Sequence, residues 1–117
     1  MSKRRKQEGK KTMTGRTALV YPGQVIRHKL FNYRGVVYDV DPVFMLEDEW
    51  YDAMTGNRPP KDAPWYRVLV HDSDEETYVA EANLEPDATG EPVNHPAIQE
   101  LFVGYREGRY VPRDYLN

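Results

Sequence analysis

The stretch YPGQVIRHKLFNYRGVVYDVDP, from Tyr21 to Pro42, decides how this chain folds. Two short runs rich in Val, Ile and Tyr, Gln24–His28 and Gly35–Val40, flank the polar connection Lys29–Arg34. Such runs fill a half-buried pleated surface, whereas Asn and Gly favour turns. The stretch therefore predicts a bent β-hairpin that begins a small barrel.

The two runs predict different patterns of burial. Val25 and Ile26 are adjacent and point to opposite faces, so we expect the first strand to be bent or covered on both sides. The second run alternates strictly, and we expect Val36, Tyr38 and Val40 to share its apolar face.

Length and composition fit one domain whose core is built on aromatic residues. The 117 residues include nine Tyr, three Phe and two Trp, and mean hydropathy is -0.81. There is no Cys, which excludes disulfides and thiolate metal sites. No run approaches the roughly 20 apolar residues of a membrane helix. We expect a cytoplasmic protein.

The formal charge of -3 hides an uneven distribution of charge. The first sixteen residues carry seven Lys and Arg side chains against Glu8 alone, a charge of +6. The other nine basic and eighteen acidic residues give the rest of the chain a charge of -9. Because nucleic-acid affinity rests largely on neutralised phosphates, this acidic body disfavours duplex DNA unless a local basic patch exists.

Composition predicts three parts of the chain. Residues 1–18 are rich in Lys, Arg, Thr and Gly and lack apolar periodicity, so we expect a disordered basic tail. Residues 19–105 hold the apolar runs and should form the domain. Residues 106–117 carry Tyr110, Val111 and Tyr115 among charges, which favours an extended C-terminal arm.

Residues 43–63 look like an insertion after the first hairpin. Leu46, Trp50 and Met54 recur every four residues, which predicts a short amphipathic helix. This helix would either pack on the mouth of the barrel or offer its apolar side chains to a partner.

After the insertion, Trp65–His71 is the clearest strand, and an acidic turn leads to a second strand over Thr77–Glu81. The apolar residues after Pro96 then follow the spacing i, i+3, i+4 and i+7, as Ile98, Leu101, Phe102 and Tyr105. This spacing predicts an amphipathic C-terminal helix that ends near Gly104.

No catalytic or metal-binding pattern stands out. His28, His71 and His95 lack metal-ligand spacing and have no matching Ser or Cys nucleophile. Asp39 and Asp41 would suit paired acid–base chemistry, but surface or turn-capping roles are more common for such a pair. We expect no enzyme activity, no metal and no cofactor.

Three blocks in this order resemble the HspQ/YccV-like domain, also called the hemimethylated-DNA-binding domain: GQVIRHKLFNYRGVVYDVDPVF, APWYRVLVHD and TYVAEANLEP. The resemblance spans about Tyr21 to Glu85, with the same order of blocks and the same long insertion between the second and third strands as in that family. The segment NHPAIQELFVGYREGRYVP, Asn94–Pro112, is more similar to the version at the end of certain F-box proteins. The resemblance implies a mainly β fold, an SH3-like five-stranded barrel with a short helical insertion and a C-terminal amphipathic helix.

The resemblance also implies two competing roles. One is an adaptor or specificity factor that helps an ATP-dependent protease of the Lon or Clp type take up substrates, in the stress response and protein quality control. The other is binding of hemimethylated DNA.

We favour the adaptor, because the body is acidic and because Trp, Tyr and Met are enriched at protein interfaces. The expected protein contacts are Phe44, Leu46, Trp50, Tyr51, Met54, Trp65 and Tyr66. DNA binding would instead require a patch made by Arg27, His28, Lys29 and Arg34. A weaker alternative is a reader of a cationic ligand, with an aromatic cage made by Tyr33, Tyr38, Trp65 and Tyr66.

Overall fold

The computed structural model describes residues 18–113; the predicted tail, except for its last residue, and the end of the predicted arm lie outside these residues. The strands are β1 (Val25–His28), β2 (Arg34–Asp41), β3 (Trp65–Val70), β4 (Glu76–Ala80), β5 (Leu84–Pro86), β6 (Phe102–Arg106) and β7 (Arg109–Pro112). The helices are α1 (Asp48–Met54), α2 (Ile98–Leu101) and the 3-10 turn η1 (Glu81–Asn83). None of the helices among residues 18–113 is long and apolar enough to cross a membrane.

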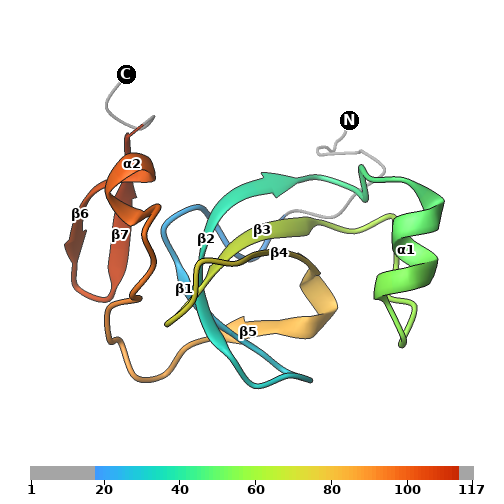
Figure 1. Cartoon of the computed structure of the whole chain (residues 1–117), viewed down its shortest axis with the longest axis horizontal. Helices are drawn as coiled ribbons and strands as arrows, with labels where there is room; N and C mark the ends of the chain where they lie inside the picture. The colour runs from blue at the N-terminus through green and yellow to red at the C-terminus, as the bar shows by residue number, and fades with distance from the viewer. Residues whose placement is uncertain (1–17, 114–117) are drawn as a thin grey trace, which may run out of the picture.

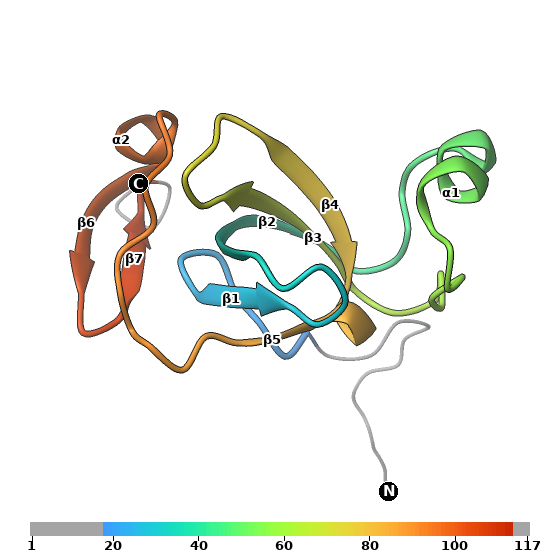
Figure 2. The same ribbon diagram turned by 60° about the horizontal axis from the view of Figure 1, so that its bottom comes forward.

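Five strands form one antiparallel sheet in the order β4-β3-β2-β1-β5. The sheet curls into a partly open barrel, with α1 at one end and the β6–β7 hairpin at the other (Figures 1 and 2). The predicted mainly β fold around five strands, with a helical insertion and a C-terminal helix, is confirmed.

Both faces of β1 are covered, as predicted. Ile26 lies in the core inside the curl, which also contains Tyr66 and Val68. Val25 lies on the other face and belongs to a second cluster with Phe102 of the hairpin. The hairpin therefore acts as a lid on the outer face of the sheet.

Gly23 joins this hairpin to the barrel. Its N–H donates to the carbonyl of Val37 at 2.7 Å, and its own carbonyl accepts from the N–H of Tyr110 at 2.8 Å. A Cβ at residue 23 would lie 2.0 Å from the carbonyl oxygen of Tyr110, and φ is +99°. Only glycine permits both the close approach and this φ.

A β-bulge in β2 changes which residues share a face. The register between β2 and β3 shifts between Val37 and Asp39. Val37 and Val40 consequently face the core inside the curl, whereas Val36 and Tyr38 face the hairpin. The prediction that Val40 shares the face of Val36 is therefore wrong, because strict alternation assumes a strand without an extra residue.

The C-terminal helix is shorter than predicted. It ends at Leu101, and the next five residues form β6. A register shift between Phe102 and Gly104 lets Phe102 and Tyr105 pack in the same cluster. This bulge reproduces the three-residue spacing of a helix, which explains the error.

The predicted boundary between residues 105 and 106 falls inside β6. Glu107 and Gly108 follow with φ of +54° and +85°, values that suit the tight turn of a hairpin. The start of the predicted arm is therefore strand β7, paired with β6.

Candidate functional site

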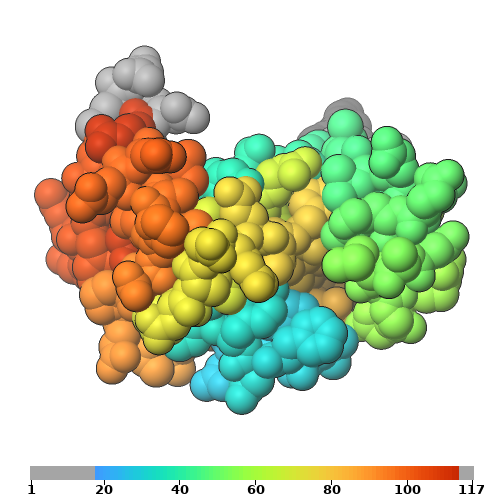
Figure 3. Space-filling model, in the orientation of Figure 1, coloured from blue at the N-terminus to red at the C-terminus, as the bar shows by residue number. Residues whose placement is uncertain are grey.

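A groove of about 640 Å³ opens between α1, the β1–β2 loop and strand β4. All five residues of β4 line it, together with Trp50 and Met54 from the α1 side and Leu30 and Phe31 from the loop. In the space-filling view, α1 in green, β4 in yellow and the loop in cyan meet around this recess (Figure 3). This groove is the candidate functional site.

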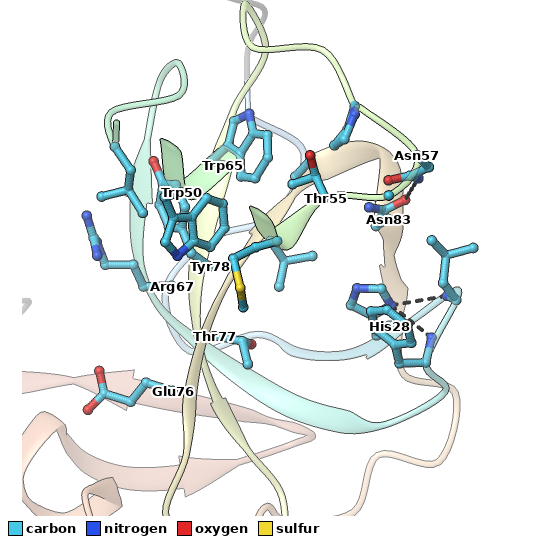
Figure 4. A pocket seen from close by; sticks show the side chains of 18 of the residues that line it. His28, Trp50, Thr55, Asn57, Trp65, Arg67, Glu76, Thr77, Tyr78 and Asn83 are labelled. Atoms are coloured by element: carbon cyan, nitrogen blue, oxygen red, sulfur yellow. Dashed lines mark hydrogen bonds between the residues drawn. The ribbon is translucent and has the colours of Figure 1, made fainter. Parts of the chain in front are cut away.

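One wall of the groove is a cluster of aromatic rings through which α1 packs on the sheet. Trp65 of β3 stacks on Tyr78 of β4, with ring centroids 5.3 Å apart. Trp50 of α1 meets Tyr78 edge-on at 5.6 Å. Phe44 meets Trp65 edge-on at 4.9 Å. Because Trp65 is buried and Trp50 only half-buried, the cluster passes from the core to the groove surface (Figure 4).

The carbonyl groups of the two prolines after α1 accept hydrogen bonds from this cluster. The hydroxyl of Tyr51 donates to the carbonyl of Pro59 at 2.6 Å, and the indole N–H of Trp65 donates to the carbonyl of Pro60 at 3.0 Å. Buried Tyr and Trp side chains generally need such partners. The insertion is therefore a fixed part of the site.

The charged side chains beside the aromatic cluster have partners there. Arg67 lies over the ring of Tyr78, 4.7 Å from its centroid, and pairs with Asp41 at 3.4 Å. The hydroxyl of Tyr78 also donates to Asp41, at 2.6 Å. Burial and a 2.6 Å hydrogen bond to Glu76 raise the pKa of Tyr38 to about 12. Both phenols are therefore neutral hydrogen-bond donors at physiological pH.

The rim of the groove exposes large apolar side chains. Leu30 is 56% exposed, Phe31 73% and Met54 64%. Beneath the loop, Nδ1 of His28 accepts hydrogen bonds from the N–H groups of Leu30 and Phe31, both at 3.1 Å. His28 lies across the groove from Trp50 and Tyr78 (Figure 4). The fold thus holds apolar groups in solvent beside an aromatic wall, as at protein interaction sites.

The structure brings most of the predicted protein contacts together. Leu46, Trp50, Met54 and Trp65 line the groove. Phe44 and Tyr51 support them from within the aromatic cluster. Tyr66 differs, because it is fully buried inside the curl and donates to Glu81 at 2.7 Å. We reassign Tyr66 to the core.

The predicted aromatic cage does not form as a unit. Tyr33, Tyr38 and Trp65 line the groove, whereas Tyr66 belongs to the core on the other face. Arg67 already occupies the face of Tyr78, the neighbouring aromatic ring. A free cage for a cation would need these rings to converge around open space.

The basic residues predicted for DNA contact are mostly paired or buried. Arg34 pairs with Asp87 at 3.1 Å, and its side chain is only 16% exposed. Arg27 donates to Asn32. It also lies 3.9 Å from Glu85. His28 is buried, and burial lowers its pKa.

Lys29 alone of these four residues is an exposed cation without an ion pair among residues 18–113. The condition set for a basic patch is therefore not met by this group.

Other titratable groups in the described part of the chain have structural contacts. Nδ1 of His71 accepts from the N–H of Asn94, and Nδ1 of His95 accepts from the N–H of Ala97. Asp39 lies 3.9 Å from Arg67. Among residues 18–113, no group of three His, Asp or Glu side chains is placed to hold a metal ion.

The part that β4 and the β1–β2 loop play in the site was not predicted from the sequence. Neither Thr77 nor Phe31 was a candidate, although both line the groove. The only available signal was the Leu30-Phe31 pair in an otherwise polar connection.

A family model described as "Hemimethylated DNA-binding protein YccV like" matches residues 21–109. The matched region covers about three quarters of the chain and includes β1 to β6, α1 and the whole groove.

Proposed function

The chain belongs to the YccV-like family, and on that premise we propose that it is a non-enzymatic protein-binding module. In this role it is an adaptor or specificity factor that delivers polypeptide substrates to an ATP-dependent protease of the Lon or Clp type. Such a role belongs to protein quality control in the cytoplasm. The observation that carries the proposal is the groove, with its aromatic wall and exposed apolar rim.

The chemistry of the groove favours polypeptide over nucleic acid. Among residues 18–113, the only cation that lines the groove is Arg67, which is paired with Asp41, since burial of His28 favours its neutral form. Duplex binding depends mainly on neutralising phosphates with Lys and Arg, whereas this surface offers rings, thioethers and aliphatic groups. Trp50 and Met54 therefore suit apolar segments of an unfolded substrate.

Binding and delivery are tested with a fluorescent, permanently unfolded protein and purified Lon and Clp proteases. We expect Trp50→Ala to weaken binding of the unfolded protein by about tenfold and to slow its adaptor-dependent degradation. Tyr21→Ala is the matched control, because it also removes an exposed aromatic ring but lies outside the groove. Equal binding and degradation with both variants would exclude the groove as the substrate site.

Duplex DNA is the second candidate partner, because the matching family description names hemimethylated DNA. Fluorescence anisotropy would compare hemimethylated, fully methylated and unmethylated duplexes, with the whole chain and with a chain lacking residues 1–18. Binding that depends on those residues and ignores methylation is electrostatic. A preference for the hemimethylated duplex in the shortened chain, lost in Lys29→Ala, would favour the DNA function over the adaptor.

A further inference from the structure

Strand β4 is an edge of the five-stranded sheet, paired with β3 on one side only. Along an antiparallel pair, residues alternately direct their backbone groups to the neighbouring strand and away from it. The N–H of Val70 donates to the carbonyl of Glu75, and the N–H of Glu81 donates to that of Pro64. These two bonds fix the alternation at both ends of β4.

From this alternation, Thr77 and Val79 direct their backbone groups toward β3. Glu76, Tyr78 and Ala80 direct theirs away from β3. Between residues 18 and 113, no hydrogen bond reaches the N–H or carbonyl groups of these three residues. Glu76 is exposed and Tyr78 is half-buried, whereas Ala80 is only 2% exposed. The accessible part of the edge is therefore Glu76–Tyr78, with two outward donors and two outward acceptors.

This open edge runs along the groove. All of Glu76–Ala80 lines the groove, which shows that the edge itself, and not one face of the strand, borders the open space. Trp50 and Met54 flank it on the α1 side, and Phe31 flanks it on the side of the loop. Open edges of this kind accept another strand, and natural proteins usually cover or charge them.

We propose that an extended segment of a partner polypeptide binds in this groove by adding to β4 as a sixth strand. The main chain of the segment bonds to Glu76 and Tyr78, the accessible outward-facing residues of β4. Its alternate side chains contact the aromatic wall on one side and the apolar loop on the other. The inference rests on the proposed protein-binding function and specifies the form of the substrate: extended, with apolar side chains on both faces.

Acidic residues at one end of the groove specify the charge at one end of the bound segment. Asp74, Glu75 and Glu76 are exposed at the start of β4, and none has an ion pair within residues 18–113. At the other end of the groove, the neutral side chains of Asn57 and Asn83 are joined by a 3.0 Å hydrogen bond (Figure 4). A Lys or Arg of the bound segment therefore lies over the acidic end, where opposite charges attract.

Backbone N-methylation of a bound peptide tests strand addition directly. Along a strand added to β4, alternate N–H groups of the peptide point to β4, so methyl groups on those nitrogens remove the donors and block the pairing. The matched control is the same peptide with the methyl groups on the other alternate nitrogens, which point away from β4.

The binding probe is selected from displayed random peptides of about seven residues, long enough to span β4. We expect the selected sequences to alternate apolar residues and to carry Lys or Arg at one end. Methylation of the nitrogens that face β4 should weaken binding of a selected peptide at least about tenfold, whereas methylation of the other nitrogens should change it less than about twofold. Glu76→Gln should weaken it less and reduce its dependence on salt.

Amide hydrogen exchange, measured by NMR on the whole chain, gives a second readout. In the free protein the amides of Thr77 and Val79 should be protected, and those of Glu76 and Tyr78 should exchange quickly. Adding the selected peptide should protect all four.

The outcomes separate the two proposals. If the peptide binds in a Trp50-dependent way, but methylation of the nitrogens that face β4 does not weaken binding and the exchange pattern is unchanged, the protein-binding function stands and strand addition is wrong. If no peptide binds in a Trp50-dependent way, both fail. Protection of the outward amides in the free protein would also overturn the proposal. Protection that disappears on dilution would mean that a second copy of the chain covers the edge. Protection that disappears in a chain lacking residues 1–17 would mean that these residues cover it.

Discussion

Two groups of residues were candidates for binding, and the fold treats them in opposite ways. The basic residues around the β1–β2 connection are dispersed among counter-charges: Arg27 near Glu85, Arg34 against Asp87. The aromatic residues of the insertion and of β3 and β4 are gathered into one cluster beside a groove. The fold pairs most of the basic group with counter-charges, and it gathers the aromatic group beside the groove.

The difference lies in how each group meets its partners. A guanidinium finds a carboxylate brought in by another segment, and Asp87 follows β5, far from Arg34 in the sequence. Aromatic rings instead accumulate, since each ring buries area against the others. An exposed charge in the sequence therefore predicts a binding patch less well than a helical stripe of aromatic residues next to a strand.

The largest expected effect tests how far the aromatic cluster stabilises the fold. Trp65→Ala removes a fully buried indole that stacks on Tyr78, so we expect the free energy of unfolding to fall by about 3–5 kcal/mol. Trp50→Ala, at a half-buried ring of the same cluster, should cost clearly less. Urea titration of both variants measures this. An equal loss would mean that the half-buried Trp50 contributes as much to stability as the buried Trp65.

The next effect tests whether the ion pair between Arg34 and Asp87 stabilises the fold. Arg34→Met leaves the Asp87 carboxylate, whose side chain has no exposed surface, without its cation, and should destabilise the protein by about 2–4 kcal/mol at pH 7. Arg27→Met, at an exposed pair, should cost less than about 1 kcal/mol.

The same pair predicts a pH dependence. Burial alone would raise the pKa of Asp87, but the hydrogen bond from Thr89 and the Arg34 guanidinium lower it below its usual range. This stabilisation is present above pH 4 and disappears in acid, so the deficit of Arg34→Met should shrink between pH 7 and pH 3. Urea titrations at both pH values would detect it, and a constant deficit would argue against the ion pair.

A smaller effect concerns the loop that holds Phe31 beside the groove. Burial lowers the pKa of His28 below its usual 6.5, so the unfolded chain takes up a proton more readily than the folded one. The free energy of unfolding should therefore fall as pH drops below 6.5, by at most about 2 kcal/mol at pH 5. His28→Asn retains an acceptor for the two loop N–H groups and should flatten this slope. An unchanged slope would assign the titration to another group.

The smallest effect is expected at Lys29. As an exposed cation, it should change the free energy of unfolding by less than about 0.5 kcal/mol when replaced by Ala, and it should leave peptide binding in the groove unchanged. Urea titration and peptide anisotropy measure both. A clear loss of peptide binding would place Lys29 in the groove site and weaken the contrast between the two groups.

Local pattern predicted the strands and the insertion helix well, and failed where a strand carries an extra residue. Val40 and Tyr105 each lie three residues from an apolar neighbour, Val37 and Phe102, and share its face because of a bulge. The same spacing describes a helix, so periodicity cannot distinguish the two. Most of the predicted contact residues converge on the groove, because α1 was recognised from its stripe.

By itself, the sequence determined the β-rich core, the antiparallel hairpins and the amphipathic insertion, because these follow from side-chain alternation and turn residues within a short span. Tertiary structure alone decided which cations are paired, where the bulges fall and which strand is left at the edge. These depend on segments far apart in the chain, such as Asp87 beside Arg34. The hairpin of Tyr21 to Pro42 specifies the barrel, and the open edge of β4 across the groove is a property of the assembled sheet.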